Sequence, residues 1–165
     1  MKIFRTVIMI IFLCNVFDGS GFSQDRALYN PEADANADIN EAIALAMKEG
    51  KHVLLQIGGN WCPWCIRLHD YYTTNQEVKA VLDDGYVIVL VNFSKENRNL
   101  DILERLEFPQ RFGFPVLVIL SAKGKRLHTQ DTGLLESGGS YDSRKVISFL
   151  KNWTPTAVNS DSYND

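Results

Sequence analysis

Apolar residues along the chain gather in three short runs, and each run predicts a buried strand. The runs are HVLLQI at 52–57, YVIVLVNF at 86–93 and VLVIL at 116–120. The second run is apolar over almost its whole length, as expected of a strand that is covered on both faces. A turn at 123–124 then predicts a hairpin into a more polar segment at 125–132. These strands indicate an α/β domain.

Apolar positions at helical spacing surround these strands. The helix in 38–49 is expected to begin at Asp38, which can form a capping box with Glu41, and to end at Gly50. Further helices are predicted at 62–72, at 75–84 after a cap at Thr74, at 100–106 and at 143–153.

The first 23 residues have the pattern of a secretory signal peptide. Lys2 and Arg5 precede a short apolar stretch at 6–17, and small residues follow up to Ser23. The apolar stretch is shorter than the roughly 20 residues that a membrane span needs. We therefore expect cleavage near Ser23 and a secreted protein, with the periplasm as its compartment. Anchoring through an uncleaved signal, or through a lipid on Cys14, is the alternative.

The rest of the chain divides into a lead-in at 24–37, one α/β domain at 38–153 and a polar tail at 154–165. The order β-α-β and then β-β-α fits a mixed central sheet flanked by helices. A hydrophobic content of 45% and a charged content of 22% are ordinary for a globular protein. The net charge is −3, and loss of the signal's two cations and one anion makes it −4. Such a charge gives no support for nucleic-acid binding.

Two cysteines, Cys62 and Cys65, remain after removal of the signal, in the stretch GGNWCPWCIRLH at 58–69. They could be a structural staple, but in the chain-entropy model a disulfide that closes four residues contributes only about 2 kcal/mol. They could belong to a metal site, but zinc usually takes four ligands, and His69 is the only further candidate close by. The third interpretation is redox exchange.

Redox exchange fits the place of the pair, where a strand passes into a helix. Cys62 then stands at the helix N-terminus, where unpaired backbone N–H groups and the helix dipole favour a thiolate. Cys62 is the expected exposed nucleophile, and Cys65, one turn further on and partly shielded, would resolve the mixed disulfide. Pro63 falls at the first helical position, where its missing N–H has no cost. A C-x-x-C motif beside a β-α-β pattern strongly indicates redox chemistry.

The chain resembles the thioredoxin superfamily in two stretches, GKHVLLQIGGNWCPWCIRLHDYYTTNQEVKAVL and GFPVLVILSAKGK. The resemblance covers roughly residues 38–152. It is closest to secreted thioredoxin-like proteins and to the C-terminal periplasmic domain of transmembrane thiol:disulfide interchange proteins. It implies a thioredoxin fold and dithiol–disulfide exchange without an organic cofactor or a metal. It also implies that Pro115 is a cis-proline that faces the cysteine pair and helps to hold an extended substrate strand.

One position departs from the pattern of this superfamily. Its members commonly carry a buried aspartate six residues before the first cysteine, which helps to move a proton to and from the second. Gln56 stands at that position and cannot titrate. His69 lies one helical turn after Cys65, so we predict that it partly replaces the missing acid as proton acceptor. The alternative is a solvent-facing histidine without a role.

Aromatic residues around the motif are the predicted substrate contacts. Trp61 matches an aromatic residue of the superfamily and is expected to pack beside the sulfur and shape the docking surface. Trp64 could contact a partner or fold back as packing. Phe114 stands where the superfamily has a small or branched residue, and could line the substrate groove or fill the core. The predicted substrate-binding residues are Trp61, Pro63, Trp64, Phe114 and Pro115.

The sequence thus predicts a secreted thiol:disulfide oxidoreductase that exchanges the Cys62–Cys65 disulfide with protein thiols and disulfides, as a reductant or electron carrier. Its electrons would come from a membrane-bound or thiol donor, and we expect a monomer. The alternative function is a non-enzymatic thioredoxin-fold module that docks partners and keeps the pair as a stable disulfide.

Overall fold

The structure, a computed structural model, describes residues 27–163, so the predicted signal peptide at 1–23 lies outside the described residues. No helix in the described part is long and apolar enough to cross a membrane. The elements, in chain order, are α1 (Ala35–Glu49), β1 (His52–Gly58), α2 (Pro63–Thr74), α3 (Gln76–Gly85), β2 (Tyr86–Asn92), α4 (Leu100–Arg105), η1 (Pro109–Phe112), β3 (Val116–Leu120), β4 (Arg126–Asp131), η2 (Thr132–Leu135), β5 (Glu136–Ser137), β6 (Ser140–Tyr141), α5 (Ser143–Asn152) and η3 (Ser160–Tyr163).

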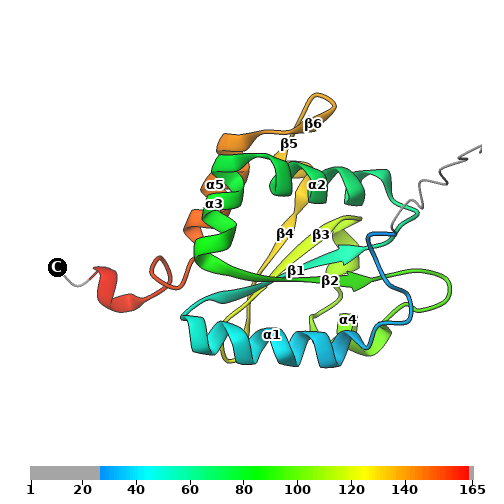
Figure 1. The fold of residues 1–165 in the computed structure, drawn as a ribbon, viewed down its shortest axis with the longest axis horizontal. Coiled ribbons are helices and arrows are strands. Elements are labelled where there is room, and N and C mark those ends of the chain that lie inside the picture. The colour runs from blue at the N-terminus through cyan, green and yellow to red at the C-terminus, as the bar shows by residue number, and fades with distance from the viewer. Residues whose placement is uncertain (1–26, 164–165) are drawn as a thin grey trace, which may run out of the picture.

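The main sheet has four strands in the order β2-β1-β3-β4. β1 is parallel to β2 and antiparallel to β3, and β3 is antiparallel to β4. Helices α1 and α4 lie on one side of this sheet, and α2, α3 and α5 on the other (Figure 1). The arrangement confirms the predicted fold, a mixed central sheet flanked by helices.

Alternation along the strands divides the core into two layers. On β1, Val53, Leu55 and Ile57 pack with α1 and α4. Leu54 points the other way and packs with α2, α3 and α5. Gln56 shares the face of Leu54 and is fully buried, so the strand carries a polar amide beneath α2.

Helix α1 begins earlier than predicted. Asp34, not Asp38, is its N-cap, and the Asp34 carboxylate accepts hydrogen bonds from the N–H groups of Asn36 and Ala37, each at 3.0 Å. Asp38 lies in the first turn, where its negative charge interacts favourably with the helix dipole. Since both aspartates suit a helix start, the sequence did not distinguish them. Gly50 ends the helix, as predicted, and does so in the left-handed conformation, with φ at 69°.

Helix α3 also has a different cap from the predicted one. The Asn75 side chain, not that of Thr74, accepts from the N–H groups of Glu77 and Val78, each at 3.1 Å. The Thr74 hydroxyl instead donates to the Asp70 carbonyl oxygen at 2.6 Å, within α2. The two helices therefore follow each other with Asn75 as the only residue between them.

Strand β2 is not covered on both faces, contrary to the prediction. Ile88 is 37% exposed, and Val87 and Leu90 are only half-buried. Among residues 27–163 the strand lies at an edge of the sheet, where it pairs with β1. The run of apolar residues in 86–93 did not reveal this edge position. The hairpin of β5 and β6 was not predicted either, because its strands have only two residues each. It brings Tyr141 against α2.

Candidate active site

The two cysteines form a disulfide at the start of α2. Their Cα atoms are 5.3 Å apart, within the usual range for a disulfide. Cys62 is the N-cap residue, and its Sγ accepts a hydrogen bond from the Cys65 N–H at 3.2 Å. Pro63 occupies the first turn of the helix, as predicted. A free Cys62 sulfur would thus face backbone N–H groups at the positive end of the helix, which favours the thiolate.

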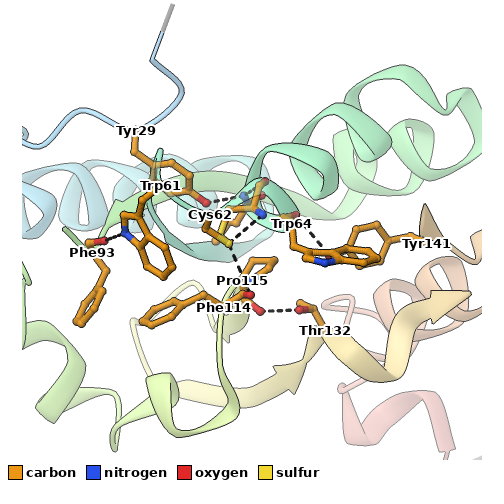
Figure 2. The surroundings of a disulfide bond; sticks show 11 residues. Tyr29, Trp61, Cys62, Trp64, Phe93, Phe114, Pro115, Thr132 and Tyr141 are labelled. Carbon is orange, nitrogen blue, oxygen red and sulfur yellow. Dashed lines mark hydrogen bonds between the residues drawn. A yellow bond between two sulfur atoms is a disulfide. The ribbon is translucent and has the colours of Figure 1, made fainter. Parts of the chain in front are cut away.

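The two sulfurs differ in accessibility less than the sequence suggested. Cys65 is fully buried, more than the partial shielding that we predicted, and Cys62 is only 5% exposed and is not the exposed nucleophile that we predicted. Figure 2 shows why, since Trp61, Phe114 and Pro115 gather around Cys62. These three side chains therefore border the approach to this sulfur.

The peptide bond between Phe114 and Pro115 is cis, as the resemblance implied. The Phe114 carbonyl oxygen lies 3.7 Å from Cys62 Sγ, so this loop faces the disulfide. The Thr132 hydroxyl donates to the Pro115 carbonyl oxygen at 2.5 Å and holds the loop from behind. Thr132 was not anticipated from the sequence.

Trp61 forms the exposed wall of the site, with 55% of its surface accessible. Its indole Nε1–H donates to the Phe93 carbonyl oxygen at 2.6 Å. Phe114 is half-buried, meets Trp61 edge-on with ring centroids 5.4 Å apart and stacks on Phe93 at 4.7 Å. It thus lines the wall and also reaches the core. Beside this wall lies a pocket of about 430 Å³, lined by Trp61, Phe93, Ser94, Lys95, Glu96 and Arg98.

Two glycines let side chains approach the backbone at the end of β1. A Cβ on Gly58 would lie 2.4 Å from Cys65 Sγ, closer than any real contact. A Cβ on Gly59 would lie 2.5 Å from Trp61 Nε1 and 2.6 Å from the Phe93 oxygen, on the path of the indole hydrogen bond. The Gly58-Gly59 pair is therefore required by the disulfide on one side and by Trp61 on the other.

Trp64 folds back against the protein. Its ring meets Tyr141 edge-on with centroids 5.6 Å apart, and the Arg67 guanidinium carbon lies 4.5 Å from the ring centre. Trp64 is half-buried and Pro63 is exposed. Of the two alternatives for Trp64, the structure thus shows packing against the protein. Contact of Trp64 and Pro63 with a partner stays a prediction.

Behind the disulfide lies a set of buried polar side chains. Gln56 Nε2 donates to the Cys65 carbonyl oxygen at 2.9 Å, and the Tyr72 hydroxyl donates to Gln56 Oε1 at 2.6 Å. His69 Nδ1 lies 3.0 Å from the Tyr72 hydroxyl. Burial lowers the pKa of His69, and the nearby Asp70 carboxylate opposes this effect.

His69 therefore makes its hydrogen bond with Tyr72, and the bonds of the described residues connect it to Cys65 only through Tyr72 and Gln56. An amide does not release and accept protons near neutral pH, so this connection provides no route for a proton. Proton transfer from Cys65 to His69 stays a prediction. Tyr72 could have been found in the sequence, since it follows His69 by three positions on one helix face. Nothing in the polar lead-in pointed to Tyr29, which is also buried here.

The described residues contain no group of three or more histidine, cysteine and acidic side chains that could hold a metal ion. The other two histidines in 27–163 serve the fold. His52 Nδ1 lies 2.9 Å from the Trp153 carbonyl oxygen, and the His128 ring stacks on the Trp153 ring with centroids 4.5 Å apart.

Comparisons with known proteins agree with this site. The chain matches the family described as thioredoxin-like over residues 34–122. It is 30% identical over 119 residues to the disulfide bond reductase DsbH of Chlamydia pneumoniae, covering 67% of this chain and 69% of that protein. It is 30% identical over 129 residues to the thiol:disulfide interchange protein DsbD of Salmonella typhi, covering 72% of this chain but only 22% of DsbD.

A solved structure with a similar fold agrees with these sequence matches. The crystal structure of a disulphide isomerase from Xylella fastidiosa Temecula1 superposes with a TM-score of 0.66 and 26% sequence identity. The superposition covers 76% of this chain and 95% of that protein.

Proposed function

The chain belongs to the thioredoxin-like family and is a thiol:disulfide oxidoreductase, and we propose that it delivers electrons from the Cys62–Cys65 pair to protein disulfides. The observation that carries this proposal is the pair itself, placed at the N-terminus of α2 and opposite the cis-proline Pro115. The direction follows the relative that is named a disulfide bond reductase.

The reaction begins with the Cys62 thiolate. It attacks one sulfur of the substrate disulfide, forms a Cys62–substrate disulfide and releases the other substrate sulfur as a thiolate. Cys65 gives its proton to that thiolate and attacks Cys62 Sγ. The Cys62–Cys65 disulfide closes and the second substrate sulfur leaves as a thiolate. Two electrons have then passed from the pair to the substrate.

The wall formed by Trp61 and Phe114 supports a protein substrate rather than a small thiol. Trp61 is largely exposed, and the adjacent pocket offers apolar surface together with Lys95 and Arg98. An extended segment of a partner, lying along the Phe114–Pro115 loop, would bring its disulfide to Cys62. Trp61, Phe114 and Pro115 would then set the position of the substrate.

Reduction of insulin disulfides, with dithiothreitol as the electron source, tests this function. Wild-type protein should accelerate precipitation of the insulin B chain. Cys62→Ser should leave only the rate of dithiothreitol alone, and Cys65→Ser should accumulate a mixed disulfide with the substrate. A non-enzymatic docking module would give no turnover that depends on Cys62, and this result would refute the proposal.

We also propose that the chain works outside the cytosol after removal of residues 1–23, with a membrane-bound protein or a small thiol as electron donor. Support comes from the charged start and the apolar stretch at 6–17. N-terminal sequencing of the protein from its native cells should find Gln24 or a close neighbour as the first residue. An unprocessed or lipid-modified N-terminus would show an anchored form instead.

A further inference from the structure

Tyr29 comes from the lead-in, where the sequence predicted no part of the site, and lies behind the disulfide. It is fully buried and forms one cluster with Cys62 and Cys65. The Asn60 side chain makes two hydrogen bonds to the Tyr29 backbone. The Tyr29 N–H donates to Asn60 Oδ1 at 2.9 Å, and Asn60 Nδ2 donates to the Tyr29 carbonyl oxygen at 2.7 Å. In Figure 2, Tyr29 and Pro115 approach Cys62 from opposite sides.

The hydrogen bonds of Gln56 determine whether the Tyr29 hydroxyl donates to Gln56 or accepts from it. One atom of the amide lies 2.9 Å from the Cys65 carbonyl oxygen, which can only accept, so this atom is Nε2. The same Nε2 lies 2.6 Å from Tyr29 Oη and donates its second hydrogen there. Oε1, on the other side, accepts from Tyr72. Tyr29 Oη is therefore an acceptor toward Gln56 and keeps its own hydrogen.

No acceptor for that hydrogen appears among the hydrogen bonds of residues 27–163, yet the Cys65 sulfur is close. A Cβ placed on Gly58 would lie 2.4 Å from Cys65 Sγ and 2.9 Å from Tyr29 Oη. The Tyr29 hydroxyl and the Cys65 sulfur thus lie next to the same position, the one that a Gly58 Cβ would occupy. Burial raises the pKa of Tyr29, so the hydroxyl keeps its proton at neutral pH and can serve as a donor.

We propose that Tyr29 donates this hydrogen to Cys65 Sγ once the disulfide opens, and that it thereby stabilises the Cys65 thiolate that resolves the mixed disulfide. This proposal rests on the proposed function, since it concerns the second step of the same exchange. The proton of Cys65 still goes to the departing substrate thiolate, and Tyr29 keeps its own. Tyr29 thus serves the electrostatic purpose of the missing acid by donation rather than by titration.

The hydroxyl has defined neighbours that bear on any pH measurement. Gln56 is neutral, and burial raises the pKa values of Tyr72 and Tyr141, which interact with Tyr29 or its hydrogen-bond partner. His69 is connected through Tyr72 and titrates below its usual pKa. The titration of His69 is therefore followed separately from that of Cys65.

Tyr29→Phe removes only the hydroxyl and tests the proposal in the full chain. Equilibration of the Cys62–Cys65 pair with glutathione should shift roughly fivefold toward the disulfide, since one buried hydrogen bond of the reduced form is lost. In a Cys62→Ser background, the ¹³Cβ signal of Cys65 should titrate at a higher pH when Tyr29 is Phe. The matched control is Tyr86→Phe, which removes a buried hydroxyl that donates to the Leu150 carbonyl oxygen. It should leave both readouts unchanged.

A second measurement needs no substitution at Tyr29. In Cys62→Ser protein, ionisation of Cys65 should shift the ¹³Cζ signal of Tyr29 with the same midpoint, and that of Tyr86 should not follow. Equal glutathione equilibria for wild type and Tyr29→Phe, or a Tyr29 signal that ignores Cys65, would overturn the inference while insulin reduction persisted. Failure of the proposed function would look different, because wild-type protein would then neither reduce insulin nor equilibrate with glutathione.

Discussion

The two sulfurs of the Cys62–Cys65 disulfide have different surroundings. On the substrate side, Cys62 meets the rings of Trp61, Phe114 and Pro115, with Trp61 largely exposed and a pocket beside it. On the buried side, Cys65 meets Tyr29 and Gln56, which are both fully buried. The substrate side is apolar and open, and the buried side is polar and closed.

We infer from this difference that one side takes part in partner docking and the other in stabilising the charge of Cys65. We propose that apolar surface on the substrate side contributes to partner docking, because its burial against a protein is favourable. Hydrogen-bond donors on the buried side act on the charge of Cys65, because a donor in a low-dielectric interior stabilises an anion more than it does in water. Substitutions on the substrate side should therefore change rates, and substitutions on the buried side should change the redox equilibrium.

The largest effect is expected from Gly58→Ala, which damages both sides at once. The added methyl group would lie 2.4 Å from Cys65 Sγ and 2.9 Å from Tyr29 Oη. We expect a loss of about 1–3 kcal/mol in the free energy of unfolding, together with slower insulin reduction. Urea denaturation measures the first quantity. Gly139→Ala is the matched control, since nothing lies within 4 Å of its added methyl group, and a similar loss there would contradict the account.

The next effect isolates the substrate side. Trp61→Ala removes the exposed wall and should slow insulin reduction roughly tenfold, the usual cost of losing an aromatic contact at a protein interface. The glutathione equilibrium should stay close to that of wild type, because the indole contacts Phe93 and Phe114 and makes no hydrogen bond to Cys65 among the described residues. Tyr163→Ala removes another exposed aromatic ring, on η3, and is the control. A changed equilibrium with an unchanged rate would reverse our assignment of the two sides.

A smaller effect is expected from Tyr72→Phe on the buried side. It leaves Gln56 Oε1 without its donor and costs about 1 kcal/mol of stability. The glutathione equilibrium should move in the same direction as for Tyr29→Phe but by less, because Tyr72 acts through Gln56. A larger shift than that of Tyr29→Phe would place the main donor elsewhere.

The smallest effect concerns pH and His69. Burial lowers its pKa in the folded protein, so the unfolded chain binds the proton more tightly. The stabilisation from neutral His69 is complete above the unfolded pKa of about 6.5 and is lost as the pH falls below it. His69→Gln should flatten this decline in urea midpoints between about pH 7.5 and 5. An equally steep decline would exclude the histidine as its cause.

His69 also remains the predicted proton acceptor for Cys65, and a rate measurement decides this separately. His69→Ala should change the pH profile of insulin reduction if the imidazole takes part. An unchanged profile would remove His69 from the chemistry and leave it as a partner of Tyr72.

The sequence was sufficient for features that depend on neighbours along the chain. The strands at 52–57 and 116–120 are apolar runs with clear ends, and Pro63 sits in the first turn because Cys62 caps the helix. The cis bond before Pro115 came from the resemblance and agrees with the structure.

Features that depend on distant contacts were not predictable. Tyr29 stands alone in a polar segment, and its burial depends on Asn60, thirty-one positions away. Trp64 folds back because the hairpin of β5 and β6 supplies Tyr141, and two-residue strands leave no periodic signal. The recessed position of Cys62 follows from a loop fifty-two residues later in the chain.

The equilibrium redox potential of the Cys62–Cys65 pair, measured on wild-type protein in glutathione buffers, tests the central claim most directly. We predict a potential below about −230 mV, toward the value of about −270 mV that is typical of thioredoxin-type reductants. A potential near about −120 mV, as in strong oxidants, would contradict delivery of electrons to protein disulfides. A pair that never equilibrates with glutathione would contradict redox exchange itself.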